Sequence, residues 1–301
     1  MLINGGLQLL AAPPPSNPSL RKNKPSFNCI GQISTAAPTA DAGLLFREKL
    51  IYLAHLKIDT RKALTQNPNL RSTPLSALHS IERCLASMGL HRAAVGRILD
   101  MYPRLLTSDP YLDIYPIFDF LLNEVGIPFP EISKSISRCP RILVCSVEAQ
   151  LRPALEFLQS LGFVGRNAIT AHTTVLLVYN IEITLKGKLE YMKSLGFEES
   201  EVRKMVVRSP GILTFSIENN LVPKIEYFQT VMKGDLEELK RFPQYFSFSL
   251  EGKIKPRHRM LVQYGLKLPL SNMLKVSDGD FIAMLMEMRL GRAKQEVDRW
   301  K

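Results

Sequence analysis

Prolines recur along this chain at a nearly constant interval, and this repeat limits the fold more than any other feature of the sequence. The recurring positions, with threonine in place of proline once, are Pro68, Pro103, Pro140, Thr174, Pro210 and Pro243. Successive members are 35, 37, 34, 36 and 33 residues apart. We call these six the register residues and count positions within each repeat from its own register residue. A period of this length predicts an array of similar units.

Four other positions agree across the five repeats that begin at residue 103 or later. Position 13 holds Pro116, Pro153, Gly187, Pro223 and Pro256. Position 6 holds residues that can cap a helix N-terminus, namely Asp109, Ser146, Asn180, Ser216 and Ser249. Position 11 holds the large aliphatic residues Ile114, Leu151, Leu185, Leu221 and Ile254. Position 8 holds Tyr111 in one repeat and otherwise acids that suit a helix N-terminus, namely Glu148, Glu182, Glu218 and Glu251.

Apolar residues at helical spacing lie on both sides of each register residue. After position 13, Ala154, Leu155, Leu158 and Leu161 fall on one stripe. The equivalent stretches end at glycines suited to a helix C-terminus, namely Gly89, Gly126, Gly162, Gly196 and Gly265. Each repeat is therefore predicted to contain a helix, a break at the register residue, a capped turn and a second helix. Strand-like runs such as residues 211–215 are interpreted as buried turns, because the helix cap follows at once.

These features predict an all-α fold, a right- or left-handed superhelical solenoid of repeats of about 33–37 residues. One pair of such helices cannot bury both apolar faces, so neighbouring repeats must stack. The hydrophobic fraction of 46% is ample for a continuous core. The four cysteines include no C-x-x-C pair, so we expect reduced, mostly buried thiols.

The first forty residues differ in composition from the rest. They contain six prolines, several Ser and Thr, and no Asp or Glu, which is typical of an organellar transit peptide. The first twenty residues carry no charged side chain, which favours a chloroplast over a mitochondrial address. We therefore expect residues 1–40 to be a disordered transit peptide and residues 41–301 to be the repeat domain. No window is long and apolar enough for membrane insertion.

The phrase from Leu213 to Pro223, LTFSIENNLVP, and its counterpart from Leu143 to Pro153 resemble the repeat of the mitochondrial transcription termination factor (mTERF) family. The resemblance covers about residues 45–290 and implies a half-doughnut of helical repeats in an organelle. It also implies a basic concave surface that binds nucleic acid, usually duplex DNA, and affects transcription termination or transcript maturation.

The Thr174 repeat lacks both prolines and the first repeat has only Pro68, which leaves their turn geometry open. Tetratricopeptide and pentatricopeptide arrays have similar periods but do not require both prolines.

Basic residues recur at fixed positions and predict a nucleic-acid-binding surface. Position −2 holds Arg138, His172, Arg208 and Arg241, and position 1 holds Arg104 and Arg141. A row of guanidinium groups at the repeat pitch suits a phosphate backbone. The alternative is that some of these arginines cap helix C-termini. A denser group follows the last register residue, with Lys253, Lys255, Arg257, His258 and Arg259, and Lys240 and Arg241 precede it. Residues 233–301 carry 14 basic and 9 acidic residues, which favours a polyanionic partner.

Other patterns favour structure over chemistry. Aromatic residues at position 17, namely Phe120, Phe157, Tyr191 and Tyr227, are either a core stripe or stacking platforms for bases, and core is favoured. Acids at position 16 are separated by a whole repeat and cannot pair as general acid and base. The chain contains no P-loop, dinucleotide fingerprint, zincin or nucleophile-elbow motif. We expect no enzyme activity, no cofactor and no metal.

Two hypotheses about function follow. The first is a monomeric transcription termination factor that binds duplex DNA, with RNA as the alternative target, and acts with the organellar transcription machinery and in transcript processing. The second is a helical-repeat scaffold for protein interaction, or an RNA-binding maturation factor without termination activity. The basic rows favour the first.

Overall fold

The computed structural model describes residues 39–299. Contacts divide the chain between Ala42 and Gly43, and the helical repeats belong to the unit that begins at Gly43. The predicted transit peptide lies outside the described residues, apart from residues 39 and 40.

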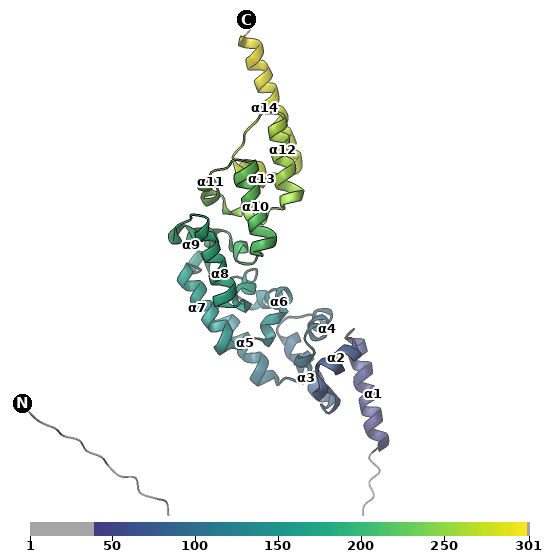
Figure 1. Ribbon diagram of the computed structural model, residues 1–301. Coiled ribbons are helices and arrows are strands. Elements are labelled where there is room, and N and C mark those ends of the chain that lie inside the picture. The colour runs from purple at the N-terminus through teal and green to yellow at the C-terminus, as the bar shows by residue number, and fades with distance from the viewer. Residues whose placement is uncertain (1–38, 300–301) are drawn as a thin grey trace, which may run out of the picture. The chain divides into compact units, whose positions relative to one another are not determined.

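The described residues form α-helices joined by short 3-10 and π turns, with no strand among them. In chain order the α-helices are α1 (Thr39–His55), α2 (Thr60–Gln66), α3 (Leu75–Ser87), α4 (Arg92–Met101), α5 (Tyr115–Asp119), α6 (Phe129–Arg138), α7 (Arg152–Leu161), α8 (Gly187–Ser194), α9 (Glu199–Arg208), α10 (Val222–Glu226), α11 (Leu236–Arg241), α12 (Lys255–Gln263), α13 (Leu270–Lys275) and α14 (Asp278–Arg299) (Figure 1). The prediction of an all-α array of helical repeats is confirmed.

Each register residue begins a 3-10 turn, as the proline pattern predicts. These turns are Pro68–Arg71, Pro103–Thr107, Pro140–Val144, Thr174–Val178, Pro210–Leu213 and Pro243–Ser247. A proline ends the preceding helix because it has no N–H to donate and its ring clashes with the carbonyl four residues earlier. The strand-like residues Ile212 and Leu213 are fully buried within one of these turns. Their interpretation as a buried turn is confirmed.

The predicted caps are also present, and the second helix begins directly after each of them. The Ser146 hydroxyl accepts a hydrogen bond from the Ala149 N–H at 3.1 Å, and the Asn180 side chain accepts one from the Ile183 N–H at 2.8 Å. The first turn after each cap is a π turn, in the segments Pro110–Ile114, Val147–Leu151, Ile181–Lys186, Ile217–Leu221 and Leu250–Ile254. The sequence analysis expected the second helix to begin after position 13. In the structure it begins earlier, directly after the cap at position 6.

The repeat of Thr174 departs from the prediction in its first helix. Between α7 and its register residue, the chain forms only a 3-10 turn, Gly165–Asn167, followed by irregular turns. Gly165 has a φ of 56°, which an α-helix does not tolerate. The Thr170 N–H donates to the Thr173 hydroxyl at 2.9 Å, so threonine side chains replace helical hydrogen bonds here. The expectation of an amphipathic helix before every register residue is wrong for this repeat.

The core runs through all repeats and contains the predicted residues. The five aliphatic side chains at position 11 are completely buried. The glycines that end the second helices have positive φ values, for example 110° at Gly162 and 98° at Gly196. A left-handed residue with no Cβ lets the helix stop and the chain turn back into the array.

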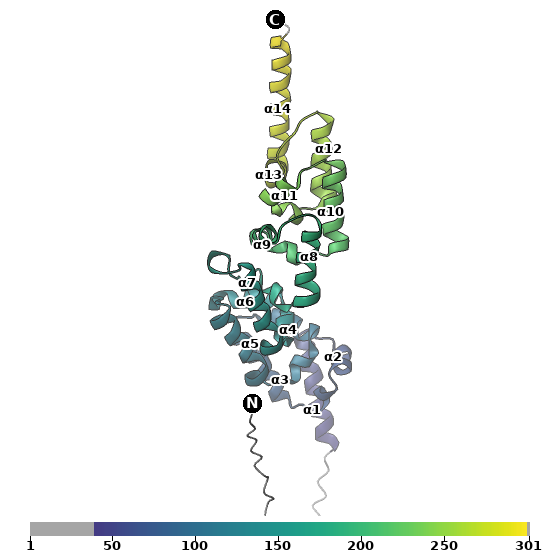
Figure 2. The ribbon, with the colours of Figure 1, turned by 60° about the vertical axis from the view of Figure 1, so that its left-hand side comes forward.

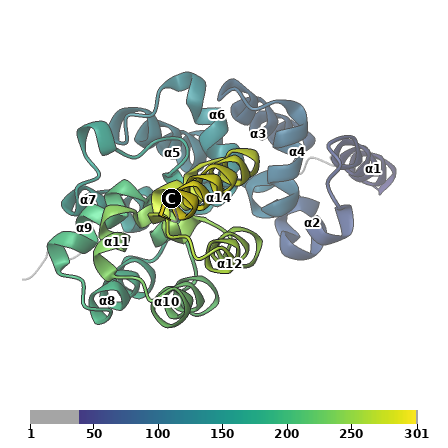
Figure 3. The ribbon, with the colours of Figure 1, turned by 90° about the horizontal axis from the view of Figure 1, so that it is seen from above.

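Buried cations join consecutive repeats in the C-terminal half. At position 14, the Lys188 ammonium donates to the Leu213 carbonyl, and the Lys224 ammonium donates to the Phe246 carbonyl. In both cases the acceptor is position 3 of the following repeat. Lys188 lies on α8 and Lys224 on α10, and these two second helices and α12 lie side by side (Figures 2 and 3). Position 14 is apolar in the two repeats before them, with Ile117 and Ala154.

Candidate nucleic-acid interface

Residues at position −2 of consecutive repeats are neighbours in space. The Arg138 guanidinium contacts the Nδ1 atom of His172, the residue at the same position of the next repeat. Arg208 reaches the end of α11 and donates to the carbonyls of Lys240 at 3.2 Å and Arg241 at 2.7 Å. The regular spacing in sequence therefore produces a row in space.

Further cations extend this row along the first helix of three repeats. They lie at position −6, one helical turn before position −2, and are Arg97 on α4, Lys134 on α6 and Lys204 on α9. All three are exposed. Sequence reasoning missed them, although the four-residue spacing to position −2 places them on the same helix face. We call the exposed cations at these two positions the first-helix strip, which comprises Arg97, Lys134, Arg138, Lys204, Arg208 and Arg241.

Members of the first-helix strip differ in how firmly they are held. Lys204 and Arg241 are exposed and form no ion pair or side-chain hydrogen bond within residues 39–299. Lys134 lies 3.8 Å from Glu131, and Arg97 donates to the Ser137 carbonyl at 3.2 Å. Arg208 caps the C-terminus of α11, as the alternative interpretation predicted for some arginines. Lys204 and Arg241 are therefore the members most available to a phosphate.

The two arginines at position 1 lie in a different setting. Arg104 lines a groove of about 550 Å³ together with Glu148, and Arg141 lines the equivalent groove of about 470 Å³ together with Glu182. Both arginines are exposed and have no side-chain partner in the described part of the chain. Arg208 and Arg241 line another groove, of about 480 Å³, with Lys275. The structure thus assigns the two predicted rows to separate grooves.

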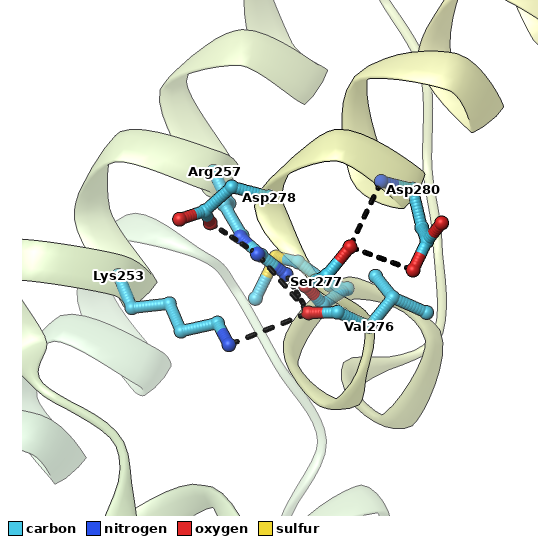
Figure 4. Close-up of polar contacts among 7 residues, drawn as sticks. Lys253, Arg257, Val276, Ser277, Asp278 and Asp280 are labelled. Carbon is cyan, nitrogen blue, oxygen red and sulfur yellow. Dashed lines mark hydrogen bonds and ion pairs between the residues drawn. The ribbon is translucent and has the colours of Figure 1, made fainter.

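The basic group of the last repeat turns partly inward. Arg257, at position 14, is only 2% exposed. Its guanidinium donates to the carbonyls of Met273 at 2.6 Å and Val276 at 3.1 Å and pairs with Asp278 (Figure 4). Lys253 points at the same Val276 carbonyl, at 3.4 Å. Because its donors are already used in the interior, Arg257 is not open to a phosphate, and we remove it from the interface.

Two other predicted lysines are neutralised locally. Lys240 lies 2.7 Å from Glu201 on α9 and also pairs with Glu237, and these hydrogen bonds raise its pKa. Lys255 pairs with Glu251 one turn away. Arg259 is exposed and has no ion pair among the described residues. Within residues 39–299, Arg259 is thus the one member of the basic group after Pro243 that is exposed and forms no ion pair or side-chain hydrogen bond.

The remaining predicted features are structural. At position 17, Phe120 and Tyr227 are buried, and Phe157 and Tyr191 pack partly buried against the core, so these four aromatic residues belong to the interior. Burial raises the pKa of the free thiols of Cys84, Cys139 and Cys145.

Within residues 39–299, no group of three or more His, Cys, Asp or Glu side chains is arranged to hold a metal ion. No helix in that range has the length and apolar character needed to cross a bilayer.

The fold and the strip define a class: an α-helical repeat protein with a row of cations at the repeat pitch. The mTERF family model matches residues 82–176 and 122–282, so the chain belongs to the mTERF family.

Several chloroplast proteins resemble parts of the chain. Transcription termination factor MTERF5, chloroplastic, of Arabidopsis thaliana is 42% identical over 136 residues, which is 45% of this chain and 27% of the relative. MTERF2, chloroplastic, of the same plant is 30% identical over 162 residues, or 54% of this chain and 20% of the relative. MTERF4, chloroplastic, of Oryza sativa subsp. japonica is 37% identical over 99 residues, which is 33% of this chain and 19% of the relative. The matched stretch thus spans about a fifth to a quarter of each relative.

Proposed function

We propose that this protein binds duplex DNA through the first-helix strip and regulates transcription, including its termination, in the chloroplast. The observation that carries this proposal is that residues at position −2 of successive repeats contact one another, Arg138 with His172 and the Arg208 side chain with the Arg241 carbonyl. These contacts support an ordered row of cations along the first helices. Lys and Arg in such a row can displace the counterions condensed on a phosphate backbone.

Two other observations support the proposed setting. The relatives described above are named chloroplastic transcription termination factors. The acid-free composition of the first forty residues is typical of a transit peptide. A fluorescent protein fused to residues 1–40 should therefore accumulate in plastids, and accumulation only in mitochondria would contradict the address.

A salt titration of DNA binding tests the interface. Each phosphate contact contributes roughly 0.9 to the slope of log affinity against log salt on duplex DNA. Replacing Lys204 and Arg241 together with Ala should flatten this slope by up to about two units. Arg208 is left intact, because it caps α11 and its loss would also alter the fold. Sequence preference should change little, since backbone contacts position a protein and base contacts specify.

A matched control removes two cations outside the strip. Lys186 and Lys193 form surface ion pairs with Glu182 and Glu190, so Lys186→Ala/Lys193→Ala changes the net charge by the same amount. This variant should retain the wild-type slope. Equal flattening in both variants would show that only total charge matters. A larger effect on single-stranded RNA than on duplex DNA would identify RNA as the target.

A further inference from the structure

One repeat replaces a recurring surface ion pair with two tyrosines. In three repeats an acid at position 8 pairs with a cation at position 12, namely Glu148 with Arg152, Glu182 with Lys186 and Glu251 with Lys255. In the repeat of Pro103 these positions hold Tyr111 and Tyr115. Their rings stack, with centroids 5.3 Å apart and planes inclined by 25°. The turn itself does not need aromatic residues here, because three sibling repeats form it with charged ones.

These tyrosines expose unusually much apolar surface. Tyr111 is 76% exposed and its neighbour Leu112 is 77% exposed, while Tyr115 is 36% exposed. One turn further along α5, Phe118 meets Phe129 edge to face at 6.0 Å, and Phe129 is half exposed. We call these five residues the aromatic stripe. Exposed aromatic side chains gathered along neighbouring segments are typical of an interaction surface.

The stripe borders a concave surface that could receive a side chain of a partner. Leu112 lines the groove of about 550 Å³ between this repeat and the next, where Val144 is also exposed. The groove therefore continues the apolar surface of the stripe across the boundary between two repeats.

The charge around the stripe is opposite to that of the whole protein. Residues 105–133 contain five acids and no Lys, Arg or His, although the chain as a whole is basic. Glu124 and Glu131 pair with Arg152 and Lys134. The other three are Asp109, Asp113 and Asp119, which form no ion pair within the described residues and lie on or next to the helix that carries the stripe. Arg104 lines the groove beside Asp113 and partly offsets it.

This charge decides between the two kinds of partner that exposed tyrosines could serve. Aromatic platforms for single-stranded nucleic acid are combined with positively charged grooves, whereas three carboxylates without an ion-pair partner in residues 39–299 repel phosphates. A protein segment with basic residues would be attracted by the same carboxylates. We propose that the aromatic stripe binds a protein segment in which lysines or arginines flank apolar side chains.

A peptide selection against the full chain tests the chemistry of this partner. A random 12-residue peptide library displayed on phage is selected on the wild type and counter-selected on Tyr111→Glu/Tyr115→Lys. This double variant installs the ion pair of the sibling repeats, so it should fold with an unchanged circular dichroism spectrum and retain its affinity for duplex DNA. Peptides that depend on the tyrosines should be rich in Lys or Arg next to Trp, Phe or Leu.

Individual selected peptides then measure the effect. By fluorescence anisotropy they should bind the double variant at least about tenfold more weakly than the wild type, as expected for loss of aromatic anchors. Asp119→Asn should weaken binding and reduce its salt dependence. The matched control Glu182→Tyr/Lys186→Tyr transfers the tyrosine pair to a repeat without the free acids, and it should not gain binding.

Three results would overturn the proposal. One is the absence of any tyrosine-dependent peptide. Another is a set of selected peptides that is acidic or uncharged. The third is tyrosine-dependent binding of oligo(dT) or oligo(U), which would make the stripe a nucleic-acid surface. None of these results bears on the salt slope of the first-helix strip, so the two proposals fail independently.

Discussion

Arg257 and Arg259 lie two residues apart on α12 and have opposite roles. Arg257 is buried, and its guanidinium satisfies the carbonyls of Met273 and Val276. The Arg257 guanidinium also lies over the Phe281 ring, with its central carbon 4.7 Å from the ring centroid. Arg259 points to solvent. A buried carbonyl without a donor costs about 1–3 kcal/mol, so the first arginine contributes to stability and the second is available for binding.

Lys224 makes the stability of the protein dependent on pH. Burial lowers the pKa of Lys224 to about 8, from about 10.4 in an unfolded chain. Between these values the unfolded chain holds a proton that the folded chain has released. The free energy of unfolding should therefore rise with pH from about 8 to 10.4, by at most about 1.4 kcal/mol per pH unit for this group.

Urea unfolding at several pH values between 7.5 and 10 measures this rise. The difference in unfolding free energy between the wild type and Lys224→Met should grow with pH, because the variant lacks the titrating amine. Lys224→Arg should behave like Lys224→Met in this respect, since a guanidinium does not lose its proton in this range. A difference that stays constant from pH 7.5 to 10 would rule out this role for Lys224.

At the scale of the element, side-chain caps at position 6 support the start of the second helix in the five repeats from Pro103 onward. Ser146 and Ser216 each accept a hydrogen bond from a backbone N–H three residues later, at 3.1 Å. Loss of such a cap costs typically about 1 kcal/mol. Ser146→Ala should lower the unfolding free energy by about this amount, measured by urea unfolding. The control Ser194→Ala removes a hydroxyl that only bonds the Tyr191 carbonyl within its helix, and an equal loss there would contradict the capping role.

The elements were predictable from sequence to the extent that they depend on local chemistry. Prolines, caps and glycines act within a few residues, so the register residues located the 3-10 turns and position 6 located the caps, although the second helix was expected only after position 13. The missing helix before Thr174 was not foreseen, because it depends on threonine hydrogen bonds that compete with the helix. The π turns were also missed, since no residue type marks them.

The candidate site was less predictable, because a cation is free only if no neighbouring repeat supplies a partner. Arg208, Lys240 and Arg257 match the basic pattern as well as Arg241 does. Their partners are carbonyls or carboxylates in another repeat, as with Lys240 and Glu201. Sequence reasoning found the row at position −2, since repetition alone produces it. It could not separate the cations that hold repeats together from those that face solvent.

At the scale of the whole molecule, each repeat is stabilised by its immediate neighbours. The main contacts between elements join segments of the same repeat or of consecutive repeats. In such an array the stability of one interface acts mainly on the two units that share it. The buried cations of the C-terminal half belong to this class of contact, because each donates to the segment that follows in the chain.

Arg257→Ala tests this local coupling by hydrogen exchange. Loss of the guanidinium leaves the Met273 carbonyl without its donor from α12 and weakens the attachment of α13 and α14. Amide exchange should accelerate by roughly ten- to a hundredfold in about residues 250–290, which corresponds to about 1.4–2.8 kcal/mol of lost local stability. Helices α4 to α7 should exchange at the wild-type rate, as should all helices in the control Arg259→Ala. Acceleration in α4 to α7 would instead show that the repeats unfold as one cooperative unit, with stability shared along the whole array.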